Sequence, residues 1–291
     1  MTNATNKNRC LLADKCKAAG SATCTNQCGH FIAVHGMSGT GGRAGAANVP
    51  KDYRLVTVAN SPARESQAEV YKMVDGYVDS LKRQFPDEYE TQVKALMAKG
   101  VAEDDARNKA RIKSLFLYSE NPGTGKTTTA SAILNAYLTT HYLGSKMRGD
   151  QPDQQPTYFL DVNNLQTDYN QFNRPRVPET VAEPAAKRYY SAMEKAKNAP
   201  FTVLDDVGLR DCTDAFRGDL HAIINHRVTN QLPTIYTSNL PIVSDVPEKE
   251  KVQAFMPYDL VDVFGERRLA DRMRDMCAVL SFAGESKRGR R

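Results

Sequence analysis

The spacing of hydrophobic and polar residues predicts a chain in which helices alternate with short buried strands. Between 65 and 85, hydrophobic residues recur at intervals of three and four, which is the period of an amphipathic helix. Elsewhere, short apolar or β-branched runs are bounded by polar or glycine-containing segments, as buried strands are. The expected strands are 114–119, 157–162, 201–206, 233–239 and 278–282. The expected helices are 65–85, 89–111, 130–138, 184–197, 213–229 and 260–276.

This alternation predicts an α/β fold, in which a mostly parallel sheet is covered by helices on both faces as three αβα layers. The segment around Pro175 and Pro178, with a polar run before it, is expected to be a loop. Pro184 suits the first turn of the helix that follows.

The first 47 residues differ from the rest, because they are polar, rich in cysteine and end in a glycine-rich run. We therefore predict a small N-terminal module at 1–36, a flexible linker at 37–47 and one large domain at 48–291.

Composition excludes some classes of protein but does not indicate a function. Apolar residues make up 41% of the 291 residues and charged residues 25%, which is ordinary globular usage. The net charge of +5 permits contact with nucleic acid without demonstrating it. The chain has neither a long apolar run nor an apolar N-terminal leader, so we expect a cytoplasmic protein without a membrane partner.

The segment between the strand at 114–119 and the following helix predicts a phosphate-binding loop. It reads Asn121, Pro122, Gly123, Thr124, Gly125, Lys126, Thr127, Thr128. Glycines let backbone N–H groups surround phosphate oxygens, and a helix N-terminus adds its positive dipole end. In such a loop we expect Lys126 to reach the β- and γ-phosphates and Thr127 to bind Mg²⁺. Thr128 would support the α- and β-phosphates.

One position departs from the usual spacing of this loop. A glycine would be expected at 120, where the chain has Glu120. A carboxylate there opposes phosphate binding unless it points away. The bland alternative, a glycine-rich turn with a chance lysine, is disfavoured by the strand and helix on either side.

Two later strands end in side chains that a nucleotide site needs. Asp205 and Asp206 follow a buried-type strand, and Asn239 ends the next one. We expect Asp205 to hold Mg²⁺ directly or through water, and Asp206 to act as the base or to position water. Asn239 would polarise the attacking water. Solvated acids at a strand end, and a residue entering a turn, are the alternatives.

Four of the six cysteines lie within nineteen residues: Cys10, Cys16, Cys24 and Cys28. In a cytosolic chain such a cluster is more often a metal site than a disulfide framework. Zinc takes four thiolate or imidazole ligands, so we predict a zinc site, with His30 as the substitute for one cysteine. A module this small would depend on metal to fold. The alternative is a reduced, metal-free head.

Taken in order, several strings resemble a known family. They are 48–53, the phosphate loop, Asp-Asp-Val-Gly at 205–208, the segment 223–227, Pro-Thr-Ile-Tyr-Thr-Ser-Asn-Leu at 233–240, and Asp-Arg-Met at 271–273. They resemble the AAA+ ATPase domain of replicative-helicase loaders of the DnaC/DnaI type, in a bacteriophage-like version. The resemblance covers about 48–291 and implies a P-loop NTPase fold without a separate lid domain.

The resemblance also implies roles. Asp205 and Asp206 correspond to the Walker B acids, Asn239 to sensor 1, Arg272 to the arginine finger and Arg288 to sensor 2. From spacing alone, the helix that carries Arg272 is a solvated basic face. Family members use ATP and Mg²⁺, associate through ATP-bridged interfaces, and place a hexameric helicase on single-stranded DNA. DnaI-type loaders carry an N-terminal zinc module that engages the helicase.

We therefore expect a slow ATPase that helps to load a replicative helicase in phage DNA replication, within the bacterial cytoplasm. Two alternatives remain open at this point. One is a transposition-helper ATPase of the IstB type, which shares the ATPase motifs. The other is an adaptor that binds ATP without hydrolysing it.

Overall fold

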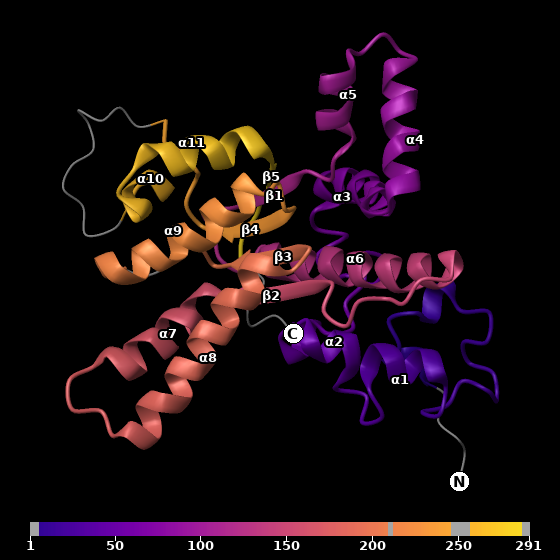
Figure 1. The fold of residues 1–291 in the computed structure, drawn as a ribbon, viewed down its shortest axis with the longest axis horizontal. Coiled ribbons are helices and arrows are strands. Elements are labelled where there is room, and N and C mark those ends of the chain that lie inside the picture. The colour runs from indigo at the N-terminus through magenta and orange to yellow at the C-terminus, as the bar shows by residue number, and fades with distance from the viewer. Residues whose placement is uncertain (1–5, 209–211, 246–256, 287–291) are drawn as a thin grey trace. The chain divides into compact units, whose positions relative to one another are not determined.

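The computed structural model describes residues 6–208, 212–245 and 257–286. The chain divides into two compact units (Figure 1). The first unit combines residues 1–112 with 131–157, and the second combines 113–130 with 158–291.

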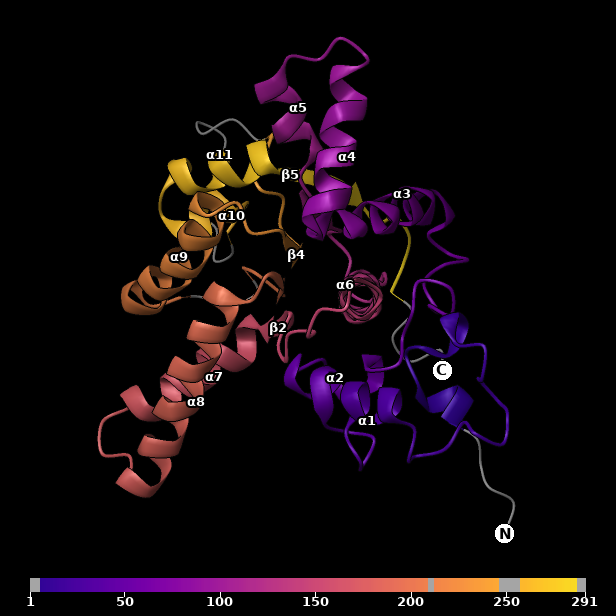
Figure 2. The same cartoon turned by 45° about the vertical axis from the view of Figure 1, so that its right-hand side comes forward.

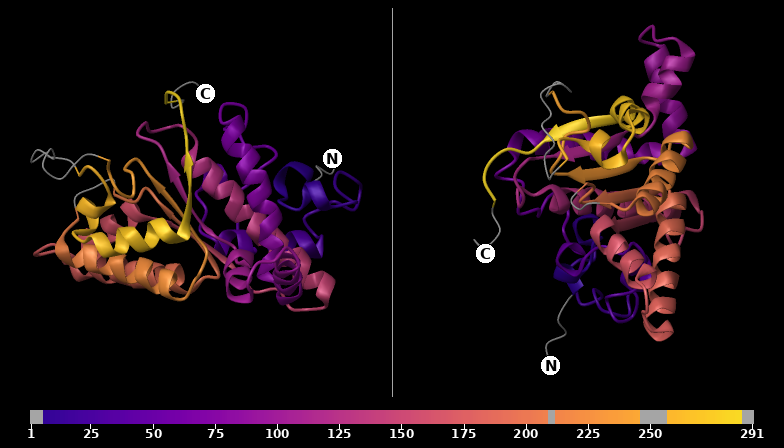
Figure 3. Two further views of the ribbon diagram at one scale, coloured as in Figure 1. Left: turned by 90° about the horizontal axis from the view of Figure 1, so that it is seen from above. Right: turned by 90° about the vertical axis from the view of Figure 1, so that its left-hand side faces the viewer.

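The second unit is built on a five-stranded sheet in the order β2-β3-β4-β1-β5. The strands are β1 (Ser114–Tyr118), β2 (Thr157–Asp161), β3 (Phe201–Asp205), β4 (Thr234–Ser238) and β5 (Cys277–Ser281). β1 pairs in parallel with β4 and β5, and β3 pairs in parallel with β4. The prediction of a parallel α/β sheet is confirmed. β5 lies at one edge of this sheet (Figure 3).

Helices supply the rest of the core of the second unit. They are α7 (Val162–Asn173), α8 (Glu179–Asn198), α9 (Asp214–Thr229), α10 (Leu260–Phe264) and α11 (Arg267–Met276). Their apolar side chains form one cluster with Phe116, Leu204 and Tyr236 of the sheet. α7 and α8 run side by side as an antiparallel pair (Figure 2).

A fully buried arginine fastens this core. Arg227 of α9 has no exposed surface, so its guanidinium is shielded from water. It donates instead to the Thr234 hydroxyl at 2.7 Å and to the carbonyl oxygens of Ala196, Lys197, Ala199 and Pro233. These bonds tie the end of α8 to the segments that enter β3 and β4. Hydrogen bonds to a charged donor are strong in such a buried site.

Two glycines in a left-handed conformation explain where two predicted helices are interrupted in the structure. The helix expected at 89–111 is two helices, α4 (Pro86–Met97) and α5 (Glu103–Ala110), separated by Gly100 at φ 84°. The helix expected at 260–276 breaks after α10, where Gly265 takes φ 70°. Left-handed glycines commonly end helices in this way.

The segment around Pro175 and Pro178 is a loop, as predicted, but the polar run before it forms α7. Asp161 caps this helix, because its Oδ1 accepts a hydrogen bond from the N–H of Asn164 at 3.0 Å. An aspartate is a preferred N-cap and so indicates the start of a helix, but the polar composition of the following residues favoured the prediction of a loop. Pro184 lies inside α8 rather than in its first turn, since α8 begins at Glu179.

The first unit is helical. Its α-helices are α1 (Gly29–His35), α2 (Gly42–Ala46), α3 (Ala68–Ser80), α4, α5 and most of α6 (Lys126–Arg148). Short 3₁₀ helices cover η1 (Asn6–Arg9), η2 (Ala13–Lys15), η3 (Lys51–Tyr53) and η4 (Leu81–Gln84). The expected helix at 65–85 corresponds to α3 and η4. No helix in the described ranges is long and apolar enough to cross a membrane.

Two buried polar side chains, His35 and Arg43, hold the N-terminal head, as we call the predicted module at 1–36, in place. The Nε2 atom of His35 accepts a hydrogen bond from the N–H of Leu11 at 3.0 Å. Arg43, in α2, donates to the carbonyl oxygens of Ala33, Pro152 and Asp153. The stretch 37–47, predicted to be a linker, thus contains a short helix with a buried arginine; the predicted domain boundaries stay a prediction.

Replacing Arg227 by alanine should lower the free energy of unfolding by about 3 kcal/mol or more, because several buried carbonyl groups would lose their donor. Urea unfolding of the purified chain measures this. The matched control is Arg188→Ala in α8, where an exposed guanidinium pairs with Asp168, and about 1 kcal/mol or less should be lost. Equal losses in the two variants would contradict the structural role of Arg227.

Candidate nucleotide site

The predicted phosphate loop lies between the end of β1 and the start of α6. Gly123 and Gly125 adopt φ values of 74° and 106°, in the region that side chains with a Cβ rarely enter. Lys126 is the first residue of α6, and its side chain is buried. Its Nζ donates to the carbonyl oxygens of Ser119 at 3.3 Å and Asn121 at 3.2 Å. The ammonium group therefore lies over the loop that carries it.

The rest of the loop is also held in place. Thr124 and Thr128 are buried, and the Thr124 hydroxyl lies 3.5 Å from the Asn121 carbonyl oxygen. The side chain of Asn121 donates to the carbonyl oxygen of Gly284, beyond β5, at 3.1 Å. Pro122 lies at the exposed tip of the loop.

The structure brings Thr127 and Asp205 together, although 78 positions separate them in the sequence. The Thr127 hydroxyl lies 3.0 Å and 3.2 Å from the two carboxylate oxygens of Asp205. Asp205 ends β3 and is only 5% exposed. Burial raises the pKa of Asp205 to about 7, and the nearby charge of Asp206 adds to the rise.

A hydroxyl and a carboxylate are oxygen ligands of the kind that Mg²⁺ takes. The donor set at Thr127 and Asp205 therefore fits this ion, and the buried lysine beside it fits the phosphates of a nucleotide. An anionic carboxylate that burial disfavours would gain from a cation placed against it.

Asp206 and Asn239 lie at the same edge of the sheet. Asp206 takes a left-handed conformation, with φ 57°, and its N–H donates to the Thr237 hydroxyl at 2.9 Å. The Asn239 side chain donates to the carbonyl oxygen of Glu120 at 3.1 Å, which links the end of β4 to the phosphate loop. The carboxylate of Glu120 is exposed and lies 3.3 Å from the Tyr118 hydroxyl.

Of the two arginines implied by the resemblance, the structure describes only Arg272. Arg272 lies on α11, and its Nη1 donates to Asn225 Oδ1 of α9 at 2.6 Å. Its guanidinium is thus engaged on a neighbouring helix of the same chain. Arg288 lies outside the described residues.

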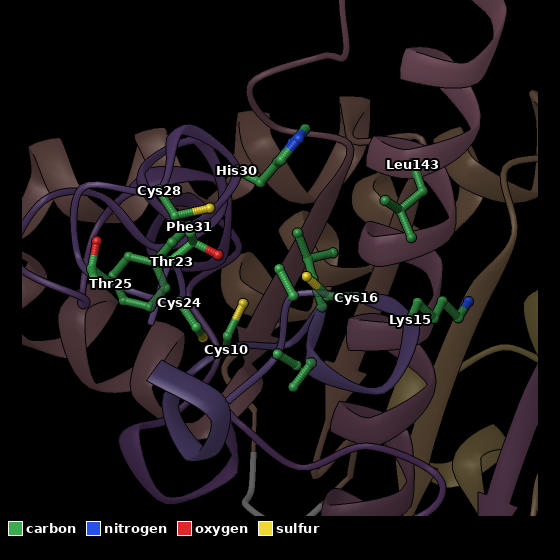
Figure 4. A pocket seen from close by; sticks show the side chains of 14 residues that line it. Cys10, Lys15, Cys16, Thr23, Cys24, Thr25, Cys28, His30, Phe31 and Leu143 are labelled. Carbon is green, nitrogen blue, oxygen red and sulfur yellow. The ribbon is translucent and has the colours of Figure 1, made fainter. Parts of the chain in front are cut away.

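The four clustered cysteines line one pocket of about 200 Å³ in the first unit (Figure 4). Burial raises the pKa of the Cys10 thiol, and the other three cysteines of the cluster also raise it. The four cysteines of the cluster carry free thiols. His30 also lines the pocket, but its imidazole extends away from the thiols in Figure 4 and its Nδ1 lies 2.8 Å from the Tyr142 hydroxyl.

The structure does not support the predicted zinc site. Among the residues that it describes, no three or more His, Cys, Asp or Glu side chains form a group that could hold a metal ion. The cysteines therefore share a pocket without converging on one point.

Sequence reasoning overlooked Thr237, the hydroxyl between the two acids. Its Oγ1 donates to Asp205 Oδ1 at 2.6 Å and accepts the N–H of Asp206. The available signal was a pair of hydroxyl residues, Thr237 and Ser238, at the polar end of an otherwise apolar strand.

No protein-family model matches the chain. The replicative helicase loader DnaI of Bacillus subtilis (strain 168) is 25% identical to it over 185 residues, which cover 60% of this chain and 48% of DnaI. The chain thus spans about half the length of this curated relative. The match supports the resemblance to helicase loaders of the DnaC/DnaI type.

Two solved structures overlap the chain more loosely. A candidate primosome component of Streptococcus pyogenes serotype M3 is 19% identical with a TM-score of 0.46, over 84% of this chain and 97% of that one. The DnaC helicase loader is 20% identical with a TM-score of 0.45, over 80% of this chain and all of that one. At these TM-scores neither overlap establishes a shared function.

Replacing Asp205 by asparagine should stabilise the nucleotide-free protein, and more so at pH 8 than at pH 5. The pKa of Asp205 rises from 3.8 in the unfolded chain to about 7 in the fold, so the folded protein holds this proton more tightly. Its contribution to the free energy of unfolding is full below pH 3.8 and is lost as the pH rises to about 7. An amide has no such loss.

Urea unfolding of both proteins in EDTA, at the two pH values, measures the effect. Titrating groups that do not interact with Asp205 act equally in both proteins, so the difference reports Asp205 together with its coupling to Asp206. A gap that is the same at both pH values would contradict the burial of an ionisable carboxylate here.

Proposed function

We propose that this protein is an ATP-dependent helicase loader, which binds a replicative DNA helicase and helps to deliver it onto single-stranded DNA. The observation that carries the nucleotide part is the approach of Thr127 to Asp205, because it joins a phosphate-type loop to a buried carboxylate. The similarity to DnaI supports the loader part. We also propose that the protein is of bacteriophage origin and that its ATPase domain has no separate lid domain.

The phosphate loop would bind the nucleotide through its backbone N–H groups and the N-terminus of α6. Lys126 would leave the carbonyl oxygens of Ser119 and Asn121 to contact the phosphates. Thr127 and Asp205 would hold Mg²⁺, which when bound neutralises phosphate charge. Asp206 would orient the attacking water and take its proton, while Asn239 would hold that water in line.

Turnover by the isolated chain should be slow. Arg272, the finger implied by the resemblance, is held by Asn225, and Asn239 is held by the phosphate loop. We propose that self-association through ATP-bridged interfaces places Arg272 against the nucleotide of a neighbouring copy. An arginine supplied in this way stabilises the charge that develops during phosphoryl transfer.

The N-terminal head would dock the helicase. We retain zinc as part of this proposal, because the four thiols line one pocket and a cation could draw them together. Binding would require the thiols to lose protons and to move to coordination distance.

Lys126→Ala should abolish binding of ATP, whereas Asp206→Asn should keep binding and stop hydrolysis. The lysine provides the charge that meets the phosphates, and the aspartate acts only in the chemical step. Equilibrium titration with a fluorescent ATP analogue and a steady-state phosphate-release assay measure the two properties. An Asp206→Asn protein that hydrolyses ATP at the wild-type rate would refute the catalytic assignment.

Cys28→Ser should remove bound zinc and weaken capture of the helicase hexamer, but leave ATP binding unchanged. The full-length chain, purified without chelator, should carry about one zinc ion. Metal analysis and pull-down with the purified replicative helicase measure these properties. The matched control is Cys212→Ser, outside the head, which should match the wild type in all three.

Two results would count against this part of the proposal. A wild-type chain without zinc would refute the metal site. Undiminished helicase capture by Cys28→Ser would refute docking through the head.

A further inference from the structure

Two buried hydroxyl side chains end β4, opposite the turn that follows β3. Thr237 and Ser238 have no exposed surface. The Thr237 Oγ1 atom donates its proton to Asp205 Oδ1 at 2.6 Å and accepts the backbone N–H of Asp206 at 2.9 Å. One hydroxyl thus uses its single donor on one acid and a lone pair on the next residue.

Backbone and side-chain bonds extend this contact by one residue. The N–H of Val207 donates to the carbonyl oxygen of Thr237 at 2.9 Å. The Ser238 hydroxyl donates to the carbonyl oxygen of Val207 at 2.7 Å. We call Thr237 and Ser238, with these four bonds to residues 205–207, the strand-end clamp.

The clamp holds a conformation that the chain would not keep unaided. Asp206 has φ 57°, a left-handed conformation that costs a residue with a Cβ about 1–2 kcal/mol. Two of the bonds fix the N–H groups of Asp206 and Val207, on either side of this strained position. A strained residue persists where its surroundings over-determine it, and such residues cluster at functional sites.

We propose that Thr237 is a positioning residue of the nucleotide site, which fixes the Asp205 carboxylate and the turn at Asp206 so that both acids are aimed before Mg²⁺ and nucleotide arrive. This inference rests on the proposed function of the site. Thr237 acts through the two acids. Ligand-orienting hydrogen bonds of this kind raise metal affinity by keeping the carboxylate in its binding position.

A second buried threonine shows that this contact is not a general need of the sheet. Thr202, near the start of β3, is equally buried, and its hydroxyl lies 3.3 Å from the carbonyl oxygen of Ala196. This hydrogen bond goes to a backbone oxygen, and Thr202 is three positions before Asp205 in β3. Thr202→Val is therefore the matched control for Thr237→Val, since each removes one buried hydroxyl at nearly constant volume.

The test uses the full chain and a fluorescent ATP analogue, titrated once with Mg²⁺ and once in EDTA. The ratio of the two affinities is the Mg²⁺-dependent gain. Thr237→Val should reduce this gain about tenfold, because a hydrogen bond to a charged group is lost. Affinity in EDTA should stay within about twofold, since the phosphate loop is untouched. Thr237→Ser, which keeps the hydroxyl, and Thr202→Val should both retain the gain.

The outcomes separate this inference from the proposed function. A wild type that takes up no nucleotide refutes the proposed function, and the positioning role with it. A wild type with a Mg²⁺-dependent gain that Thr237→Val retains refutes the positioning role alone. A loss as large in Thr237→Ser or Thr202→Val also refutes it, because a packing defect would then explain the effect.

Thermal unfolding in EDTA shows whether each variant is folded. If Thr237→Val does not fold, the comparison passes to Thr237→Ser and Thr237→Cys. The thiol of cysteine fits the same space but is a weak donor. Thr237→Cys should then lose the Mg²⁺-dependent gain, and an unchanged gain would overturn the proposal.

Discussion

The parallel pairing of β3, β4 and β1 is the constraint on which the candidate site depends. Parallel neighbours end at the same edge of a sheet, so the residues that follow them meet there. Thr127 and Asp205 are 78 positions apart in sequence, and Asn239 and Glu120 are 119 apart, yet each pair is in hydrogen-bond contact. β4 lies between β1 and β3 and bonds both the phosphate loop and the acidic turn. A register shift in any of these strands would separate the groups.

The same edge carries a buried carboxylate and a buried ammonium group. Asp205 is buried beside a second acid, and its hydrogen bonds to Thr127 and Thr237 only partly offset the rise of its pKa. Lys126, next to Thr127 in the sequence, is buried, and its ammonium group donates to the carbonyl oxygens of Ser119 and Asn121. A bound cation and a bound polyanion would together satisfy both side chains.

The sequence predicted the parts of this arrangement that depend on local pattern. Apolar or β-branched runs located all five strands. Such runs are typical of strands buried on both faces, as β1 to β4 are, whereas β5 at the sheet edge is mostly exposed. The pattern failed where one residue decides the outcome, as at Asp161, which caps α7, and at Gly100 and Gly265, which end helices.

Contacts between segments far apart in the chain could not be predicted from the sequence. Arg43 donates to the carbonyl oxygens of Pro152 and Asp153, more than 100 positions away, and no spacing rule predicts such a bond. That the N-terminal module needs metal to fold stays a prediction. Thr237 was overlooked for the same reason, since the partner of a hydroxyl in a strand depends on which strand lies beside it. The roles of Arg272 and Arg288 came from resemblance alone and stay predictions.

The central claim is that Thr127 and Asp205 hold a divalent cation against a nucleotide in the phosphate loop. Electron paramagnetic resonance of Mn²⁺, substituted for Mg²⁺ and added with ATP to the full chain, tests this directly. We predict a protein-bound Mn²⁺ signal with phosphorus coupling from ATP, which is lost in Thr127→Val. A spectrum that stays that of free Mn²⁺–ATP would contradict the account.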